Sequence, residues 1–134
     1  MTERSTAAGR KAPVSGAGFT LIEIMVVLTL IAILASIAVP LYRNSVVKAR
    51  EAALLENLYR MREAIDKYYA DMDEYPPSLS ELVEKKYIRT VPEDPVTKSS
   101  DTWVEVPAEE GSGVYDVHSG SELVGRSGTP YSEW

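Results

Sequence analysis

The sequence predicts an α+β fold, in which one long N-terminal helix packs against a small C-terminal antiparallel sheet with loops. The first observation is a long segment near the N-terminus that is apolar in its first half and amphipathic in its second. The second is a pair of short alternating segments near the C-terminus, separated by a glycine-containing stretch that is typical of a hairpin. A chain of 134 residues has room for one small domain and one such extended element.

The amino-acid composition argues against several classes of function. Acidic residues outnumber basic ones by 20 to 14, and the net charge of −6 argues against nucleic-acid binding, which requires a basic face. The chain has no cysteine, which excludes thiol catalysis, zinc–thiolate sites and disulfides. The single histidine, His118, has no cluster of partners in the sequence, so we expect no enzyme.

The N-terminal third predicts a membrane segment. Residues 1–18 are small, polar and weakly basic, which is typical of a leader without regular structure. From Ile24 to Tyr42 the chain has 19 residues without a charged side chain, enough to cross a bilayer as a helix. Because basic residues precede this block, the positive-inside rule places the N-terminus in the cytoplasm and the bulk of the chain on the far side.

The apolar block continues into an amphipathic helix. After Pro40, apolar residues recur at three-, four- and seven-residue spacings and form one stripe. The stripe comprises Val47, Leu54, Leu58, Met61, Ile65, Tyr68 and Met72. Since a proline inside a helix removes one backbone hydrogen bond, we expect one helix from Thr20 to about Asp73 that is kinked near Pro40.

The remainder predicts short elements. Tyr75-Pro76-Pro77 ends the long helix, and Ser78 and Glu81 have the spacing of a capping box for a short second helix. We expect strands at 103–106 and 114–117, a hairpin loop at 109–113 and a loop from 119 to 134.

One short motif stands out, Gly18-Phe19-Thr20-Leu21-Ile22-Glu23. A glutamate at bilayer depth costs about 2.5–3.5 kcal/mol unless it has a partner. One interpretation is local, because Thr20 and Glu23 are spaced as a capping box. Another interpretation of the block is an ordinary secretory signal peptide with a cleavage site at Ser36-Ile37-Ala38, but it leaves Glu23 unexplained.

The motif and its basic leader resemble those of the type IV pilin and pseudopilin superfamily. The resemblance implies a pilin-like fold, cleavage by a prepilin peptidase between Gly18 and Phe19, and methylation of Phe19. It also implies that Glu23 of one subunit pairs with the Phe19 α-amine of its neighbour in a filament, as an assembly residue. A carboxylate and an amine attract strongly at low dielectric, whereas a lone charge there is heavily penalised.

The resemblance also implies a division of the chain. Residues 1–18 would be the cleaved leader, and residues 19–42 would be the hydrophobic half of the long helix, transmembrane before assembly. Residues 43–134 would then form a periplasmic pilin-like globular domain.

Two further stretches are similar to the major pseudopilin of type II secretion. They are Tyr75-Pro76-Pro77-Ser78-Leu79 with Pro92-x-Asp94-Pro95, and Val114-Tyr115-Asp116-Val117-x-Ser119. The resemblance implies a structural subunit of a periplasmic pseudopilus that exports folded proteins. It implies as partners further copies of the chain, an inner-membrane assembly platform and minor pseudopilins. The alternatives are a type IV pilus subunit for adhesion, motility or DNA uptake, or a membrane-anchored binding module that does not polymerise.

The C-terminal loop departs from that subfamily, whose acidic loop usually binds calcium. Here Asp116, Glu122 and Glu133 are the only carboxylate side chains from residue 116 onward, and they are weak candidates for a metal site because they are widely spaced. We therefore expect no cofactor, and do not favour calcium. We expect Tyr131 and Trp134 to anchor the loop by folding back onto the sheet.

Overall fold

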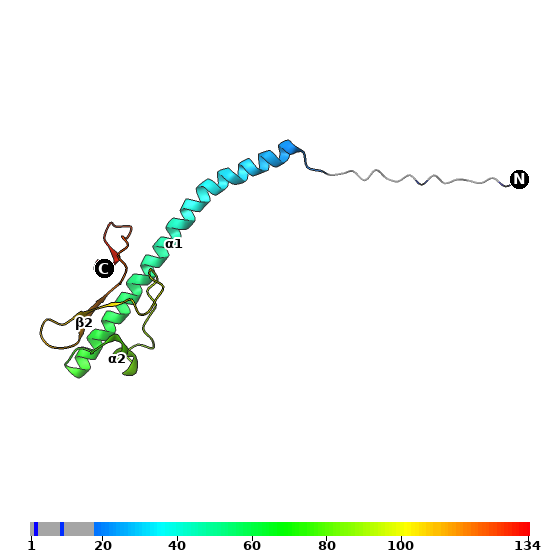
Figure 1. Cartoon of the computed structure of the whole chain (residues 1–134). Coiled ribbons are helices and arrows are strands. Elements are labelled where there is room, and N and C mark those ends of the chain that lie inside the picture. Colours follow the sequence, from blue (N-terminus) through cyan, green and yellow to red (C-terminus); the bar gives the residue numbers. More distant parts are fainter. Residues whose placement is uncertain (1, 3–8, 10–17) are drawn as a thin grey trace. The chain divides into compact units, whose positions relative to one another are not determined.

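The structure is a computed structural model that describes residues 2, 9 and 18–134. Most of the predicted leader at 1–18 therefore lies outside the described residues. The chain divides into two compact units, Met1–Pro40 and Leu41–Trp134. Its elements in order are α1 (Leu21–Met72), α2 (Leu79–Glu84), β1 (Val104–Pro107), β2 (Val114–His118) and the 3-10 helix η1 (Tyr131–Glu133) (Figure 1).

Helix α1 confirms the predicted long helix to within a residue at each end. The helix continues through Pro40, and the kink expected there stays a prediction. At its C-terminal end, Asp73 adopts the left-handed conformation (φ 57°) and donates its amide to the Tyr69 carbonyl at 2.8 Å. An aspartate tolerates this conformation better than most residues, so it ends the helix shortly before Pro76.

The core of the Leu41–Trp134 unit lies on one face of α1. The predicted stripe supplies buried residues from Leu54 to Tyr68, and Ala64 joins them. The prediction was wrong for Met72, which is 44% exposed because the helix ends there. The other elements contribute the rest of the core: Leu79, Leu82, Trp103, Val114, Val117 and Tyr131.

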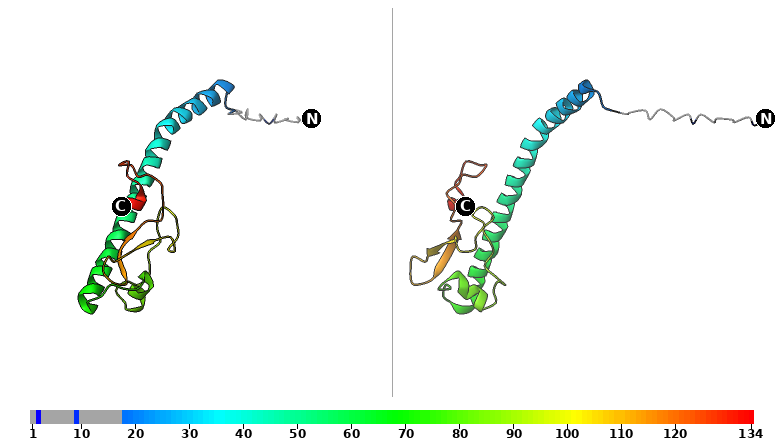
Figure 2. Two further views of the ribbon diagram at one scale, coloured as in Figure 1. Left: turned by 60° about the vertical axis from the view of Figure 1, so that its left-hand side comes forward. Right: turned by 45° about the vertical axis from the view of Figure 1, so that its right-hand side comes forward.

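Strands β1 and β2 form an antiparallel hairpin, which confirms the predicted sheet with β1 shifted by one residue. Val104 lies opposite His118 and Val106 lies opposite Asp116, with an irregularity at Pro107. Figures 1 and 2 show the hairpin and α2 alongside the C-terminal half of α1. The described strands and α2 thus cover the apolar face of this half of the helix.

The capping box predicted for α2 is wrong. Ser78 occupies the N-cap position but makes no side-chain hydrogen bond. Instead, the Leu79 amide donates to Glu105 Oε1 of β1 at 3.2 Å. A carboxylate from the sheet therefore accepts a hydrogen bond from a backbone amide at the start of α2, which has no acceptor within the helix. The spacing of residues in the sequence does not reveal this tertiary contact.

Candidate functional site: the N-terminal end of helix α1

The junction predicted for cleavage lies immediately before α1. Gly18, Phe19 and Thr20 are outside regular structure and exposed, and Phe19 is 76% exposed. A β-carbon built on Gly18 meets no atom within 4 Å. The peptide bond between Gly18 and Phe19 is therefore sterically accessible in this structure.

Glu23 lies in the first turn of α1. Its amide donates to Thr20 Oγ1 at 3.2 Å, so the threonine hydroxyl caps the helix start. The Glu23 carboxylate makes no hydrogen bond or ion pair with any residue that the structure describes. Of the two hydrogen bonds of the predicted capping box, the one accepted by the Thr20 hydroxyl forms and the one accepted by the Glu23 carboxylate does not. The negative charge of Glu23 nevertheless suits a helix N-terminus.

The apolar half of α1 follows directly. Every residue from 21 to 42 is exposed, and by length and composition this part of α1 could cross a membrane. An uninterrupted apolar surface of this kind is unusual for a soluble helix and marks a membrane or protein contact.

The three metal-ligand candidates do not form a cluster. Asp116 Oδ1 accepts hydrogen bonds from Arg62 Nε and from the Val117 amide, both at 2.8 Å. Glu122 and Glu133 are exposed. Among the described residues, no group of three or more Asp, Glu, His or Cys side chains is placed to hold a metal ion.

The loop that follows β2 is attached to α1 by Arg62 and Glu51, two charged residues outside the predicted apolar stripe. Besides Asp116, Arg62 Nη2 donates to the main-chain oxygens of Val117 (3.0 Å) and Trp134 (2.7 Å). Glu51 Oε1 accepts from the Arg126 amide and from the Tyr131 hydroxyl. Helical periodicity could not single these two out, because their partners lie 54 to 80 residues away.

Aromatic packing completes this attachment. Tyr131 is 5% exposed, and its ring lies edge-on to Trp134 at 4.9 Å between centroids. Both side chains fold back as predicted, onto the core formed by β2 and α1. His118 is the last residue of β2, and its Nδ1 lies 2.7 Å from the Trp134 main-chain oxygen.

The Pro92-x-Asp94-Pro95 motif has a structural role. Asp94 is fully buried; its Oδ1 accepts from the Val96 amide at 2.8 Å and its Oδ2 from Ser119 Oγ at 2.5 Å. The bond between Asp94 and Ser119 joins the two stretches that resemble the major pseudopilin subfamily, 92–95 and 114–119. A buried carboxylate is tolerated when donors satisfy it in this way.

Comparison with known proteins places the N-terminal motif in a recognised class. Residues 16–39 match the family described as "Prokaryotic N-terminal methylation motif". The chain is 33% identical over 118 residues to type II secretion system core protein G of Escherichia coli, covering 76% of this chain and 79% of that protein. The chain belongs to this core protein G family.

Other relatives, one of them a further core protein G and one a fimbrial protein, match over shorter spans. The Klebsiella pneumoniae protein is 33% identical over 94 residues, covering 58% of this chain and 67% of its own length. Fimbrial protein EcpC of Eikenella corrodens is 33% identical over 79 residues, covering 55% of this chain and 52% of its own length. No solved structure matches the chain. Core protein G is the major pseudopilin of type II secretion, a structural rather than enzymatic family, as the sequence predicted.

Proposed function

We propose that this chain is the structural subunit of a periplasmic pseudopilus in type II secretion. The precursor spans the inner membrane through the apolar half of α1, with its N-terminus in the cytoplasm. Prepilin peptidase removes residues 1–18 and methylates Phe19. The subunits then polymerise through their N-terminal helices, and the growing filament drives folded proteins through the outer membrane.

The observation that carries this proposal is the Glu23 carboxylate at the start of an exposed apolar helix. Thr20 already caps the Glu23 amide, and the Glu23 carboxylate has no hydrogen-bond or ion-pair partner among the described residues. Cleavage before Phe19 would create an α-amine, which is largely protonated at neutral pH. In a helix-packed filament, that amine on a neighbouring subunit is a chemically suitable partner for the Glu23 carboxylate.

The proposal implies several partners besides further copies of the chain. They are the prepilin peptidase, an inner-membrane assembly platform and minor pseudopilins. Nucleic acid is not among them, because the chain carries a net charge of −6.

A type IV pilus subunit is the second candidate. It is favoured by the similarity to EcpC and to type IV major fimbrial protein FimA of Dichelobacter nodosus, which is 43% identical over 49 residues. The shared span is short, however, and the match to core protein G covers more of the chain.

Electron microscopy of filaments sheared from overproducing cells tests the proposal. The unaltered chain forms filaments, whereas Glu23→Ala inserts into the membrane but forms few or none. Glu56→Ala is the matched control, because Glu56 is an exposed glutamate of the same helix that pairs, among the described residues, with Arg60 alone. If Glu23→Ala forms filaments as abundantly as the control, Glu23 has no role in assembly and acts only within its own helix.

A further inference from the structure

Three tyrosines line a pocket beside the hairpin loop. The rings of Tyr69 and Tyr75 stack at 4.5 Å between centroids, and Tyr115 meets Tyr75 edge-on at 5.6 Å. Tyr69 is 42% exposed and Tyr115 is 57% exposed, so ring surface remains open to solvent. With residues 106–110 of the hairpin, these rings enclose about 510 Å³.

The backbone holds the hairpin loop firmly against this cluster. The Val114 amide donates to the Pro76 carbonyl at 2.7 Å, and the Ala108 amide closes the loop onto Gly113 at 3.0 Å. Gly113 has φ 122°, and a β-carbon there would lie 2.7 Å from the main-chain carbonyl oxygen of Tyr75. Only glycine permits this approach, so the pocket is built into the fold rather than formed by a loose loop.

The pocket has the chemistry of a cation site. Glu109 and Glu110 line it, are exposed, and form no ion pair with any described residue. Tyrosine faces attract a guanidinium, and carboxylates can pair with it through two hydrogen bonds. An arginine side chain satisfies both requirements better than a lysine ammonium does.

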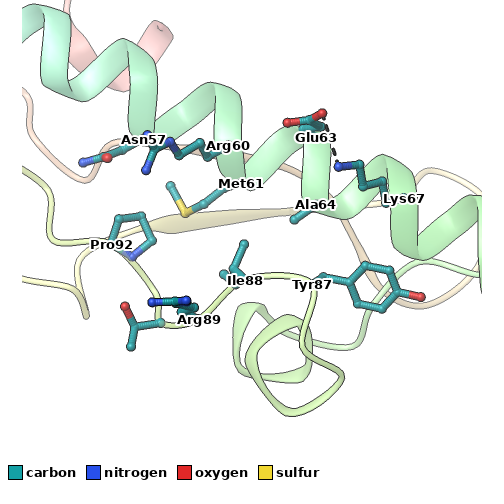
Figure 3. Close-up of a pocket in the computed structure, with 11 residues that line it drawn as sticks. Asn57, Arg60, Met61, Glu63, Ala64, Lys67, Tyr87, Ile88, Arg89 and Pro92 are labelled. Atoms are coloured by element: carbon teal, nitrogen blue, oxygen red, sulfur yellow. Dashed lines mark ion pairs between the residues drawn. The ribbon is translucent and has the colours of Figure 1, made fainter.

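A suitable arginine lies on another surface of the same unit. A groove of about 440 Å³ lies between α1 and the segment that follows α2. Figure 3 shows the residues that line it. Two of its cations already have partners on α1, since Arg60 pairs with Glu56 and Lys67 pairs with Glu63. Arg89, on the rim of the groove, is exposed and forms no ion pair with the described residues.

The groove and the tyrosine pocket are separate surfaces, because no residue lines both. In Figure 1 the hairpin loop extends to the left of the helix, whereas α2 and the segment after it lie to the right. Arg89 does not line the tyrosine pocket of its own copy. Two different surfaces that complement each other produce a head-to-tail contact, which repeats without closing and so forms a filament.

We propose that Arg89 of one copy enters the pocket of the next copy, stacks on the tyrosine rings and pairs with Glu109 or Glu110. This inference rests on the proposed function, because it describes a lateral contact within the filament. The contact adds to the helix packing a polar interaction that fixes the angle between neighbouring globular units.

Cysteine crosslinking in filaments tests the contact directly, because the chain has no cysteine of its own. Full-length protein carrying Arg89→Cys and Glu110→Cys is assembled and treated with a short bis-maleimide, since residues joined through long side chains stand too far apart for a disulfide. We expect a ladder of dimers, trimers and higher multimers. Arg89→Cys with Glu122→Cys is the matched control, because Glu122 is an exposed glutamate away from the pocket.

The outcomes separate this inference from the proposed function. Filaments with a ladder only in the Arg89–Glu110 variant support the contact. Filaments without a ladder, or with an equal ladder in the control, overturn the contact and leave the filament proposal standing. An absence of filaments from the unaltered chain overturns both.

A charge exchange gives a second readout. We expect filament yield to fall at least several-fold in Arg89→Glu, and also in the double variant Glu109→Lys, Glu110→Lys. Combining all three substitutions should restore the yield. Circular dichroism of each variant confirms that the globular unit is folded. If the combined variant is as deficient as the single changes, the pairing is wrong.

Discussion

Arg62 Nε lies 2.8 Å from Asp116 Oδ1, although 54 residues separate them in the chain. The same guanidinium also binds two main-chain oxygens, so one side chain of α1 holds both β2 and the C-terminal loop. These three hydrogen bonds attach β2 and the C-terminal loop to α1 through protein groups alone.

Replacing Arg62 should therefore destabilise the globular unit. We expect Arg62→Met to lower its free energy of unfolding by about 2 kcal/mol, because three partly buried hydrogen bonds are lost while the apolar stem is kept. Thermal unfolding of residues 41–134 should show a fall in Tm of about 10 °C. Arg60→Met is the control: its ion pair with Glu56 is exposed and worth less than about 1 kcal/mol, so an equal effect would contradict the account.

Calcium should have little influence on this unit. Asp116 already accepts two hydrogen bonds, and Glu122 and Glu133 are exposed and not clustered with it. Chelator and sub-millimolar calcium should give the same Tm, whereas deleting residues 131–134 should lower it because the buried Tyr131 is lost. A rise of several degrees with calcium would restore the metal site typical of the subfamily.

Alkaline pH should weaken the fold in part through Tyr87. Its hydroxyl donates to Asp71 Oδ2 at 2.6 Å, and this hydrogen bond, with burial, raises the pKa of Tyr87 to about 12. The pKa of Tyr87 is higher in the folded chain than the value near 10 in the unfolded chain. The contribution of Tyr87 to the free energy of unfolding is therefore complete below pH 10 and is lost as the pH rises towards 12.

Tyr87→Phe should consequently be less stable than the parent at pH 8, and the two should converge above pH 11 in denaturant titrations. Tyr59→Phe provides the control, because Tyr59 is 64% exposed and makes no hydrogen bond with the described residues. A difference that persists unchanged at pH 12 would show that the phenol proton is not responsible.

Processing should depend on Gly18 for reasons unrelated to the fold. A side chain at Gly18 meets no other atom, so Gly18→Leu should leave membrane insertion and the globular unit intact. We expect the precursor of this variant to keep its leader on immunoblots. Gly9→Leu, at a glycine with equally open surroundings, should be cut normally. Normal cutting of Gly18→Leu would place the junction elsewhere.

The sequence predicted the elements whose signals are local. Periodicity identified α1 and most of its buried stripe, and alternation identified both strands. It could not show that Glu105 would satisfy the start of α2 in place of Ser78, nor that Glu51 and Arg62 would hold the C-terminal loop. These contacts join residues that are distant in the chain, and a charged side chain near the edge of a helix stripe has the same local pattern whether it is free or paired.

The N-terminal motif was the most predictable feature of the candidate site. Gly18, Phe19 and Glu23 lie within six consecutive residues of the chain, so recognising them needs no tertiary information. The pocket at Tyr69, Tyr75 and Tyr115 was not foreseen, because the close approach of Gly113 to Tyr75 exists only in the folded hairpin.

The mass of the subunit recovered from sheared filaments tests the central claim most directly. Intact-mass and peptide mass spectrometry of that fraction should find a chain that begins at Phe19 and carries one N-terminal methyl group. Filaments built from a chain that retains residues 1–18, or the absence of this protein from the sheared fraction of secreting cells, would contradict the account.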